Sequence, residues 1–455
     1  ELGHVRASGG LVETLLTRNL ARCGSGGPRQ GWTFAHSLVR SCLEEMAREA
    51  GRLEDLHRLC AAMLVDVTGP GIAERRARHL IAAGELFEAI KPLLVAIDER
   101  MVTGHYSVAN LLLVEREQAL VATGATWNGR ECVENWLRWA RLAAAVGKIG
   151  DATAWISRVE QQSRAQRFGR MLVDSLLLQG RLARLRGEGA STWRILFEAE
   201  QLAHGDPTRW RLGLVQLEMG RQLVQRGGLM RAAELLRECR ENLEYAEDHG
   251  GMAEAFAVFA DLALQGGRFG AASVLLDWAS SRSTWLGSRV GEGLCSLYSA
   301  RLYRMRGDLH NAEAAARDAL DILRTLGAWQ VSCVEQELAL LDIAHCRYGA
   351  ARARLEPALR TFVLQEMNGH AGYAHLAMSA ACVGASDAKG LRRHVNKARQ
   401  LLTDTGMVSL DVRRLAEHTA VEAMAAGLVD EALVLQQIAE VQRQVLQKSS
   451  RGHAA

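Results

Sequence analysis

The chain has 455 residues, of which 48% are apolar, 43 are glycine and only five are proline. Low proline, with glycine concentrated at turns, favours a long helical array. The formal net charge of +3 is too small to indicate nucleic-acid binding by itself, although the cationic residues are 50 arginines and five lysines.

Residues 1–66 predict a small mixed segment. We expect a helix over residues 11–20, a flexible turn over 24–28 and a short strand over 32–36, where apolar and polar residues alternate. A second helix begins at Leu38. Helix, glycine-rich loop, strand and helix in this order are typical of the end of a winged-helix module. We therefore assign residues 1–66 to a winged-helix or adaptor region.

The next segment, residues 67–125, predicts an irregular helical adaptor. Helical periodicity covers residues 72–83, 86–101 and 105–122, and Gly124 and Gly129 mark a break over residues 123–130. The sequence leaves open how the helices between residues 54 and 125 pair.

From residue 126 to residue 448 the sequence repeats with a period near 40. Each repeat has a small residue, a second one 12 positions later and a third 7 positions after that, with slips of one residue and a few larger side chains. The sets are Ala140, Ala152 and Val159; Gly180, Thr192 and Ala199; Gly220, Ala232 and Cys239; Ala260, Ala272 and Ala279; Ala300, Ala312 and Ala319; Ala339, Ala351 and Ala358; Ser379, Leu391 and Ala398; and Ala420, Ala432 and Ala439. A further set, Ala77, Ala89 and Ala96, lies upstream.

This small-residue pattern predicts a helical hairpin in each repeat. Two antiparallel helices approach closely only where side chains are small, and residues seven apart share one helix face. Glycine in the turn suits the left-handed position that ends a helix. One hairpin cannot bury its own apolar face, so neighbouring hairpins stack into a solenoid. Residues 449–455 are expected to form a disordered tail.

The spacing of 12 across a turn and 7 along the second helix resembles the tetratricopeptide repeat (TPR). The resemblance implies an all-α fold, a right-handed superhelical solenoid of about 8–9 TPR-like helical hairpins preceded by a winged-helix remnant. TPRs usually span 34 residues and close with a proline, whereas Thr284, Arg324 and Gln444 occupy that place here. A HEAT or armadillo array, with a period of about 40 residues, is the alternative.

Arginines recur at one place in the repeat. Four of them stand eleven residues before the central small residue and two follow one helical turn later: Arg141, Arg181, Arg221 and Arg301, then Arg184 and Arg304. The TPR resemblance implies that this face of the first helix lines the concave groove. Because guanidinium groups match carboxylates and phosphates, we predict that the groove binds a protein segment or an anionic small effector. Alternatively, each arginine pairs with a local acid such as Glu218, or is solvated.

Residues 32–62 resemble the junction after the ATPase domain in bacterial signal-transduction ATPases with numerous domains (STAND). The residues that carry the resemblance are Phe34, His36, Leu38, Arg40, Leu56, His57, Ala61 and Ala62. It implies that the chain is the C-terminal arm of a longer protein, with ATP and Mg²⁺ bound in an upstream module. Relatives of this kind carry a serine/threonine kinase at the N-terminal end, or a DNA-binding domain for transcriptional regulation at the C-terminal end. His36 is then a candidate nucleotide sensor; alternatively it anchors the strand–helix junction.

The sequence carries no catalytic or metal-binding motif: GxxxxGK[ST], HExxH, CxxC and GxSxG are absent. Residues 89–91 mimic the kinase lysine motif, but no glycine-rich loop precedes them and no His-Arg-Asp or Asp-Phe-Gly follows. We therefore expect no enzyme activity, no catalytic residue, no metal and no cofactor in this chain.

The nine dispersed cysteines favour small buried side chains in a reducing cytoplasm. No signal segment opens the chain, and its longest uncharged run, residues 367–386, is too polar to span a membrane. The basic stretch over residues 392–399 is attributed to a solvated outer face. We expect a cytoplasmic protein without nucleic-acid or membrane contacts.

Together these features predict a non-enzymatic repeat arm that binds a protein segment or effector and regulates an upstream NTPase or kinase module in cis. The alternative is a free-standing TPR scaffold that bridges protein partners. Trp136, Trp139 and Trp155 are candidates for an aromatic pocket, although the place of Trp155 in its repeat favours the core.

Overall fold

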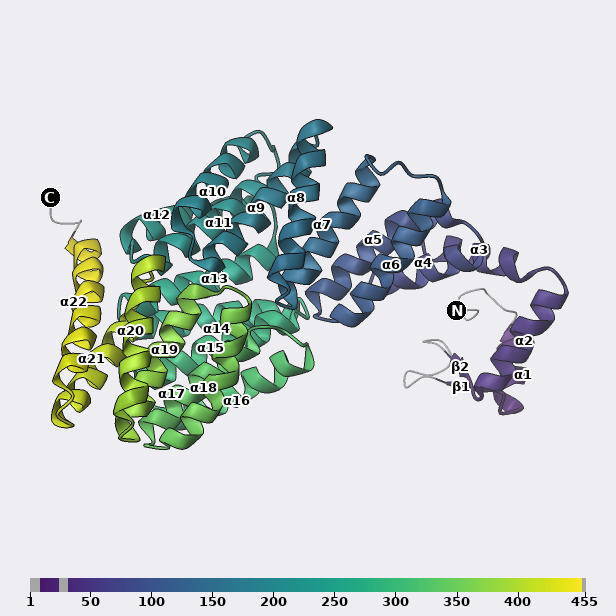
Figure 1. Ribbon diagram of the computed structural model, residues 1–455. Helices are drawn as coiled ribbons and strands as arrows, with labels where there is room; N and C mark the ends of the chain where they lie inside the picture. The colour runs from purple at the N-terminus through teal and green to yellow at the C-terminus, as the bar shows by residue number, and fades with distance from the viewer. Residues whose placement is uncertain (1–8, 24–31, 452–455) are drawn as a thin grey trace. The chain divides into compact units, whose positions relative to one another are not determined.

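The computed structural model describes residues 9–23 and 32–451, and the chain divides into two compact units. One unit comprises Glu1–Glu99 with Val108–Asn135, and the other comprises Arg100–Ser107 with Trp136–Ala455. Figure 1 labels the helices and strands.

The first unit opens with a helix, two short strands and a second helix. α1 spans Gly9–Thr17, β1 Ala21–Cys23, β2 Trp32–Phe34 and α2 Ser37–Glu49. The strands pair antiparallel, with Ala21 opposite Phe34 and Cys23 opposite Trp32. The sequence predicted β2 but not β1, because three residues are too few for an alternating pattern to stand out. The turn predicted over residues 24–28 lies outside the described residues.

Four helices follow, α3 (Leu53–Met63), α4 (Ile72–Ala82), α5 (Leu86–Val102) and α6 (Tyr106–Ala122). α4, α5 and α6 begin and end within one residue of the predicted ranges. Ala77, Ala89 and Ala96 are at most 1% exposed, so the small-residue pattern already applies here. Residues 89–91, which mimic the kinase lysine motif in sequence, form part of a helical turn inside α5.

The helices α7–α22 form eight successive hairpins within the described residues. They are α7 (Arg130–Ala145), α8 (Ile149–Ala165), α9 (Gly169–Arg186), α10 (Gly189–Ala203), α11 (Trp210–Gln225), α12 (Leu229–Tyr245), α13 (His249–Gln265), α14 (Phe269–Trp285), α15 (Arg289–Met305), α16 (Leu309–Thr325), α17 (Val331–Ala344), α18 (Tyr348–Leu364), α19 (Asn368–Gly384), α20 (Ala388–Thr405), α21 (Leu410–Ala425) and α22 (Val429–Arg451). The architecture is the predicted right-handed superhelical solenoid of TPR-like hairpins.

The small-residue pattern marks where the two helices of a hairpin cross. A Cβ atom at Gly180 would lie 2.5 Å from Leu196 Cδ2, and one at Gly220 would lie 2.5 Å from Leu236 Cδ2. Each leucine therefore packs directly against the backbone of the facing helix, which only a very small residue allows. Gly187 and Gly227, in the turns that follow, have φ of 82° and 75°, the left-handed conformation expected there.

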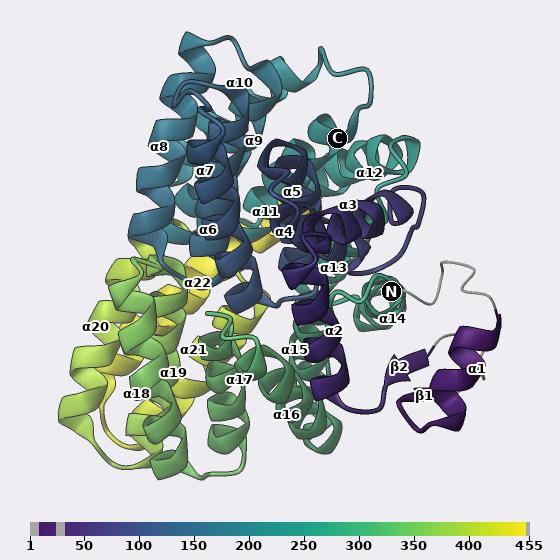
Figure 2. The ribbon, with the colours of Figure 1, turned by 90° about the vertical axis from the view of Figure 1, so that its right-hand side faces the viewer.

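The odd-numbered helices α9–α21 form an inner layer, because each contacts the next odd-numbered helix. α9 also contacts α19, and α13 contacts α21, so the inner layer closes on itself. In Figure 2, the green helices α18–α20 lie below α8–α10 on the same side of the view. Two hydrogen bonds join the end of α11 to the end of α20 and the segment before α21. Val408 N donates to Gln225 O at 2.8 Å, and Arg226 donates to Thr405 O at 3.0 Å. The C-terminal hairpins thus pack against the turns that end the first helices of earlier repeats.

Several expectations need correction or restriction. Cys42 and Cys346 are exposed, so the prediction that the cysteines are buried is wrong for these two. α22 continues to Arg451, past the expected start of the tail at 449, and residues 452–455 lie outside the described residues. In the part of the chain that the structure describes, no helix combines the length and apolar character needed to cross a membrane.

Candidate functional site

The predicted arginines lie on the first helices of their hairpins, and all except Arg141 belong to the inner layer of α9–α21. Arg141 is on α7, Arg181 and Arg184 are on α9, Arg221 is on α11, and Arg301 and Arg304 are on α15. The structure brings all of them except Arg141 into two clusters of ion pairs, each built around a glutamate that is almost fully buried.

The first cluster surrounds Glu218 of α11, whose side chain is 1% exposed. Arg181 donates to Glu218 Oε1 at 2.9 Å, Arg221 donates to the same oxygen at 2.8 Å, and Arg184 donates to Oε2 at 3.3 Å. Glu254 extends the cluster, because Arg221 also donates to it at 2.7 Å. Its side chain is 49% exposed, so Glu254 is the accessible acid of this cluster.

The second cluster surrounds Glu337 of α17, also 1% exposed. Arg304 donates to Glu337 and binds Asp411 of α21 through two hydrogen bonds of 3.0 and 2.5 Å. The hydroxyl of Tyr373 on α19 donates to Asp411 Oδ2 at 2.5 Å. This cluster therefore joins α15, α17, α19 and α21 across the closure.

The pairs follow a rule between neighbouring repeats. An arginine on one first helix contacts an acid 33 or 34 residues later, on the next first helix: Arg141 with Asp174, Arg184 with Glu218, Arg221 with Glu254, and Arg304 with Glu337. The local pairing of Arg221 with Glu218 is present, as the alternative interpretation expected. The sequence did not indicate that Glu218 also receives arginines from the preceding repeat.

Burial and charge oppose each other at these acids. Burial by itself would raise the pKa of Glu218, but Arg181, Arg221 and Arg184 outweigh it and hold this pKa well below its usual value. Burial would also raise the pKa of Asp411, yet Arg304 lowers it to about 2. Both carboxylates are therefore ionised at neutral pH and are satisfied by arginine.

The clusters are nearly neutral as a whole. Among the described residues the five arginines of the two clusters (Arg181, Arg184, Arg221, Arg301 and Arg304) face five carboxylates, namely Glu218, Glu254, Asp261, Glu337 and Asp411. The inner layer therefore lacks the strong positive field that a row of unpaired arginines would create.

Members of the clusters differ in how open they are to exchange. Arg304 is held by Glu337 and Asp411, whereas Arg181 keeps 37% of its side chain exposed. Arg301 Nε is buried and finds no hydrogen-bond acceptor among the described residues; Glu337 Oε2 lies 3.7 Å away. Arg181 and Arg301 are thus the positions with capacity for a further acceptor.

Other candidate residues lie apart from the clusters. His36 is exposed at the start of α2, where its side chain makes no capping hydrogen bond. Trp139 and Trp155 stack with ring centroids 6.3 Å apart, and Trp155 packs against a buried core. Arg392, in the basic stretch, bonds Glu431 at 2.8 Å and is 70% exposed, in keeping with a solvated face.

The acids that complete the clusters were missed by the sequence analysis. Glu218 and Glu337 both lie two residues before the first small residue of their repeats, Gly220 and Ala339. That shared offset is a signal that could have found them. Asp411 and Tyr373 carry no such signal, because their place in the cluster depends on the closure of the solenoid.

Comparison with known proteins finds no matching family and no matching curated protein. Among solved structures, a Rap protein complexed with Competence and Sporulation Factor is similar, with a TM-score of 0.59 and 13% identity over 80% of this chain and 99% of that one. A STAND protein with a TPR sensor from Pyrococcus horikoshii gives a TM-score of 0.40 and 13% identity over 96% of this chain and 59% of that one. The similarity to the Rap protein confirms the TPR-like solenoid fold.

Proposed function

We propose that the chain is a non-enzymatic binding arm whose inner layer holds an acidic protein segment or an anionic small effector. The observation that carries this proposal is the uneven saturation of the inner-layer arginines. Arg301 Nε has no acceptor among the described residues, and Arg181 and Arg221 share the half-exposed Glu254.

Binding proceeds by exchange. A ligand carboxylate takes the place of Glu254 against Arg181 and Arg221, while Glu218 stays in place because it is buried beneath them. A second acceptor on the ligand meets the guanidinium group of Arg301, whose side chain is 23% exposed. Exchange of one carboxylate for another preserves the charge balance. The favourable binding free energy therefore comes from the additional acceptor on the ligand, while the displaced Glu254 carboxylate is hydrated by solvent.

We further propose that occupancy is passed to an upstream NTPase or kinase module in cis, with His36 facing the nucleotide. The resemblance of residues 32–62 to the STAND junction supports this part. The shared fold supports only the binding part, because the similar Rap protein was solved in complex with a factor. A ligand acts in this way only if it binds the two states of the array unequally.

The test uses fluorescein-labelled hexapeptides of aspartate and glutamate, with lysine hexapeptides as the charge control. Arg181→Glu together with Arg221→Glu should abolish binding of the acidic peptides, whereas Arg231→Glu with Arg237→Glu, on the exposed surface of α12, should not. Since charge reversal beside Glu218 is also expected to destabilise the fold, Glu254→Gln gives an opposite readout. It removes the competing acid and should tighten binding several-fold.

Unchanged affinity in both the Arg181/Arg221 and the Glu254 variants would exclude the inner layer as the binding site. The regulatory part is tested separately by the native reading frame. A start codon close to Glu1 would refute control of an upstream module and leave the free-standing scaffold.

A further inference from the structure

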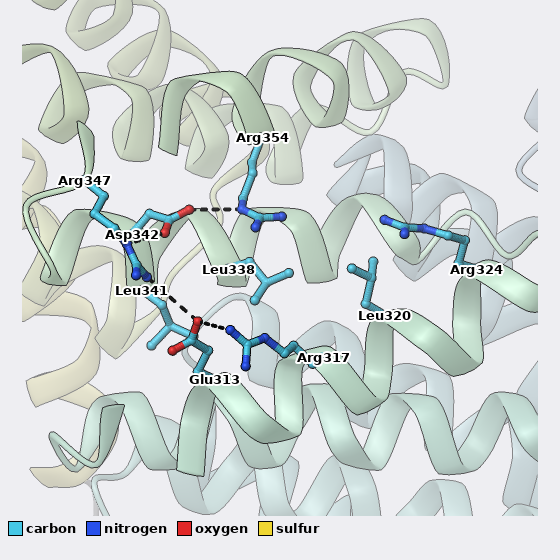
Figure 3. Close-up of a pocket in the computed structure, with 9 residues that line it drawn as sticks. All are labelled: Glu313, Arg317, Leu320, Arg324, Leu338, Leu341, Asp342, Arg347 and Arg354. Carbon is cyan, nitrogen blue, oxygen red and sulfur yellow. Dashed lines mark hydrogen bonds and ion pairs between the residues drawn. The ribbon is translucent and has the colours of Figure 1, made fainter. Parts of the chain in front are cut away.

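A second charged site lies away from the inner-layer clusters, between α16, α17 and α18. It is a pocket of about 280 Å³, with Leu320, Leu338 and Leu341 among its lining residues. Four arginines surround these leucines: Arg317 and Arg324 from α16, Arg354 from α18, and Arg347 from the turn before α18. In Figure 3, Leu338 lies between Arg354 above it and Arg317 below it, and Leu320 lies on the side nearer Arg324.

The arginines alternate with three acids in one continuous chain. Glu313 lies 2.6 Å from Arg317 and 3.9 Å from Arg347. Asp342 lies 2.9 Å from Arg347 and 3.0 Å from Arg354. Glu335 lies 2.8 Å from Arg354 and 3.0 Å from Arg324. The chain thus begins and ends on arginine, and among the described residues that form it the net charge is positive.

The acids and the arginines of this chain of ion pairs differ in solvent exposure. Asp342 is 8% exposed, whereas Arg317 and Arg324 at the two ends are 68% and 61% exposed. The acids therefore lie beneath and the guanidinium groups face solvent. Four guanidiniums offer about twenty N–H donors, and three carboxylates accept about twelve hydrogen bonds, so donors are in surplus at the mouth of the pocket.

We propose that this pocket binds a small organic oxyanion, a carboxylate or a phosphate carried on a short apolar group. The oxyanion meets the exposed N–H groups of the arginines, whose planar geometry suits either chemistry. The apolar part covers the leucines. The volume lies just below the usual range for drug-sized ligands, roughly 300–1,000 Å³, which favours a small molecule over a folded partner.

Titration calorimetry with phenyl phosphate, benzoate and inorganic phosphate, at low ionic strength, tests the proposal. Saturable 1:1 binding of phenyl phosphate or benzoate is expected, and the stronger of the two identifies the preferred oxyanion. Arg317→Gln and Arg324→Gln should each weaken it roughly tenfold or more, because each removes charge-assisted hydrogen bonds. These two arginines are the most exposed of the four, so their loss should leave the fold intact, as circular dichroism can verify.

Arg360→Gln is the matched control, because Arg360 is exposed on α18 and does not line the pocket. Its binding should equal that of the unmodified chain. The proposal would be overturned if no probe bound saturably, or if Arg317→Gln and Arg324→Gln both bound the probe as tightly as the unmodified chain. Equal affinity for inorganic phosphate and phenyl phosphate would refute the role of the leucines.

Discussion

Arg304 and Asp411 form a two-bond ion pair, at 3.0 and 2.5 Å, although 107 residues separate them in the sequence. The pair joins the first helix of one hairpin to the first helix of the hairpin three further on. It therefore belongs to the closure of the solenoid rather than to the contact between consecutive repeats. A one-dimensional stack would have no such contact.

Asp411→Asn is expected to destabilise the closed array. The substitution leaves Arg304 with one partner in a largely buried place, and loss of one member of a buried pair costs about 3–5 kcal/mol. Urea unfolding measures the free-energy change, and hydrogen exchange should show lost protection in α21 and α22. Asp404→Asn, at an exposed position on α20, is the control and should change little. Equal effects of the two substitutions would contradict a structural role for the pair.

Gly220→Ala is expected to destabilise the hairpin of α11 and α12. The new Cβ would lie 2.5 Å from Leu236 Cδ2, and such overpacking costs about 1–3 kcal/mol even though alanine favours helices. Gly270→Ala on α14 is the matched control, since a Cβ there meets nothing within 4 Å. It should stabilise by about 0.5–1 kcal/mol. The midpoints of thermal unfolding of both variants, compared with that of the unmodified chain, test this prediction. A higher midpoint in Gly220→Ala would refute the proposed reason for the small-residue pattern.

Gly227→Ala is expected to loosen α22 specifically. Gly227 and Gly267 occupy equivalent turns with φ of 75° and 70°, so alanine strains both to a similar extent. A Cβ at Gly227 would in addition lie 2.9 Å from Val408 and from Val445, whereas one at Gly267 meets nothing within 4 Å. Hydrogen exchange in α22 should therefore increase in Gly227→Ala but not in Gly267→Ala. The same exchange pattern in both variants would argue against the packing of α22 on this turn.

Stability is expected to fall as the pH is lowered from about 6.5 to 4. Burial is the main cause that lowers the pKa of His370, His375 and His394 to about 4 each. Between the ordinary pKa near 6.5 and the folded value, the unfolded chain binds protons that the folded chain does not, so protonation favours unfolding. Asp411 adds a further loss as the pH falls from its ordinary pKa of 3.8 towards 2, because the folded chain keeps the pKa of this carboxyl at about 2.

Urea midpoints at pH 7.5, 6 and 4.5 measure this dependence, which amounts to about 1.4 kcal/mol for each pKa unit of each histidine. His394→Gln should reduce the slope, since it removes one depressed group and its contact with His375, 2.8 Å away between Nδ1 atoms. A midpoint that does not change between pH 7.5 and 4.5 would show that these histidines titrate normally.

The sequence by itself determined the repeat, the hairpins and the helix face that carries the arginines. These features depend on the 3.6-residue helical period, on small residues at helix crossings and on glycine in tight turns, all of which act over one or two neighbouring repeats. Ala272 and Ala312 could thus be assigned to the core from spacing alone, and both are fully buried. The pairing of Arg221 with Glu218 was within reach for the same reason, because the two residues are one turn apart.

Only the tertiary structure decided what those arginines contact and how the array closes. The rotation between successive hairpins is small, but it accumulates over many repeats, so the meeting of Arg304 with Asp411 cannot be read from any local pattern. One-residue slips add to this uncertainty, as in the step of 39 rather than 40 residues from Ala312 to Ala351, next to the arginine-lined pocket. The side-chain partners of long, flexible arginines depend on that geometry, which is why the sequence located the row but not its neutralisation by acids from neighbouring hairpins.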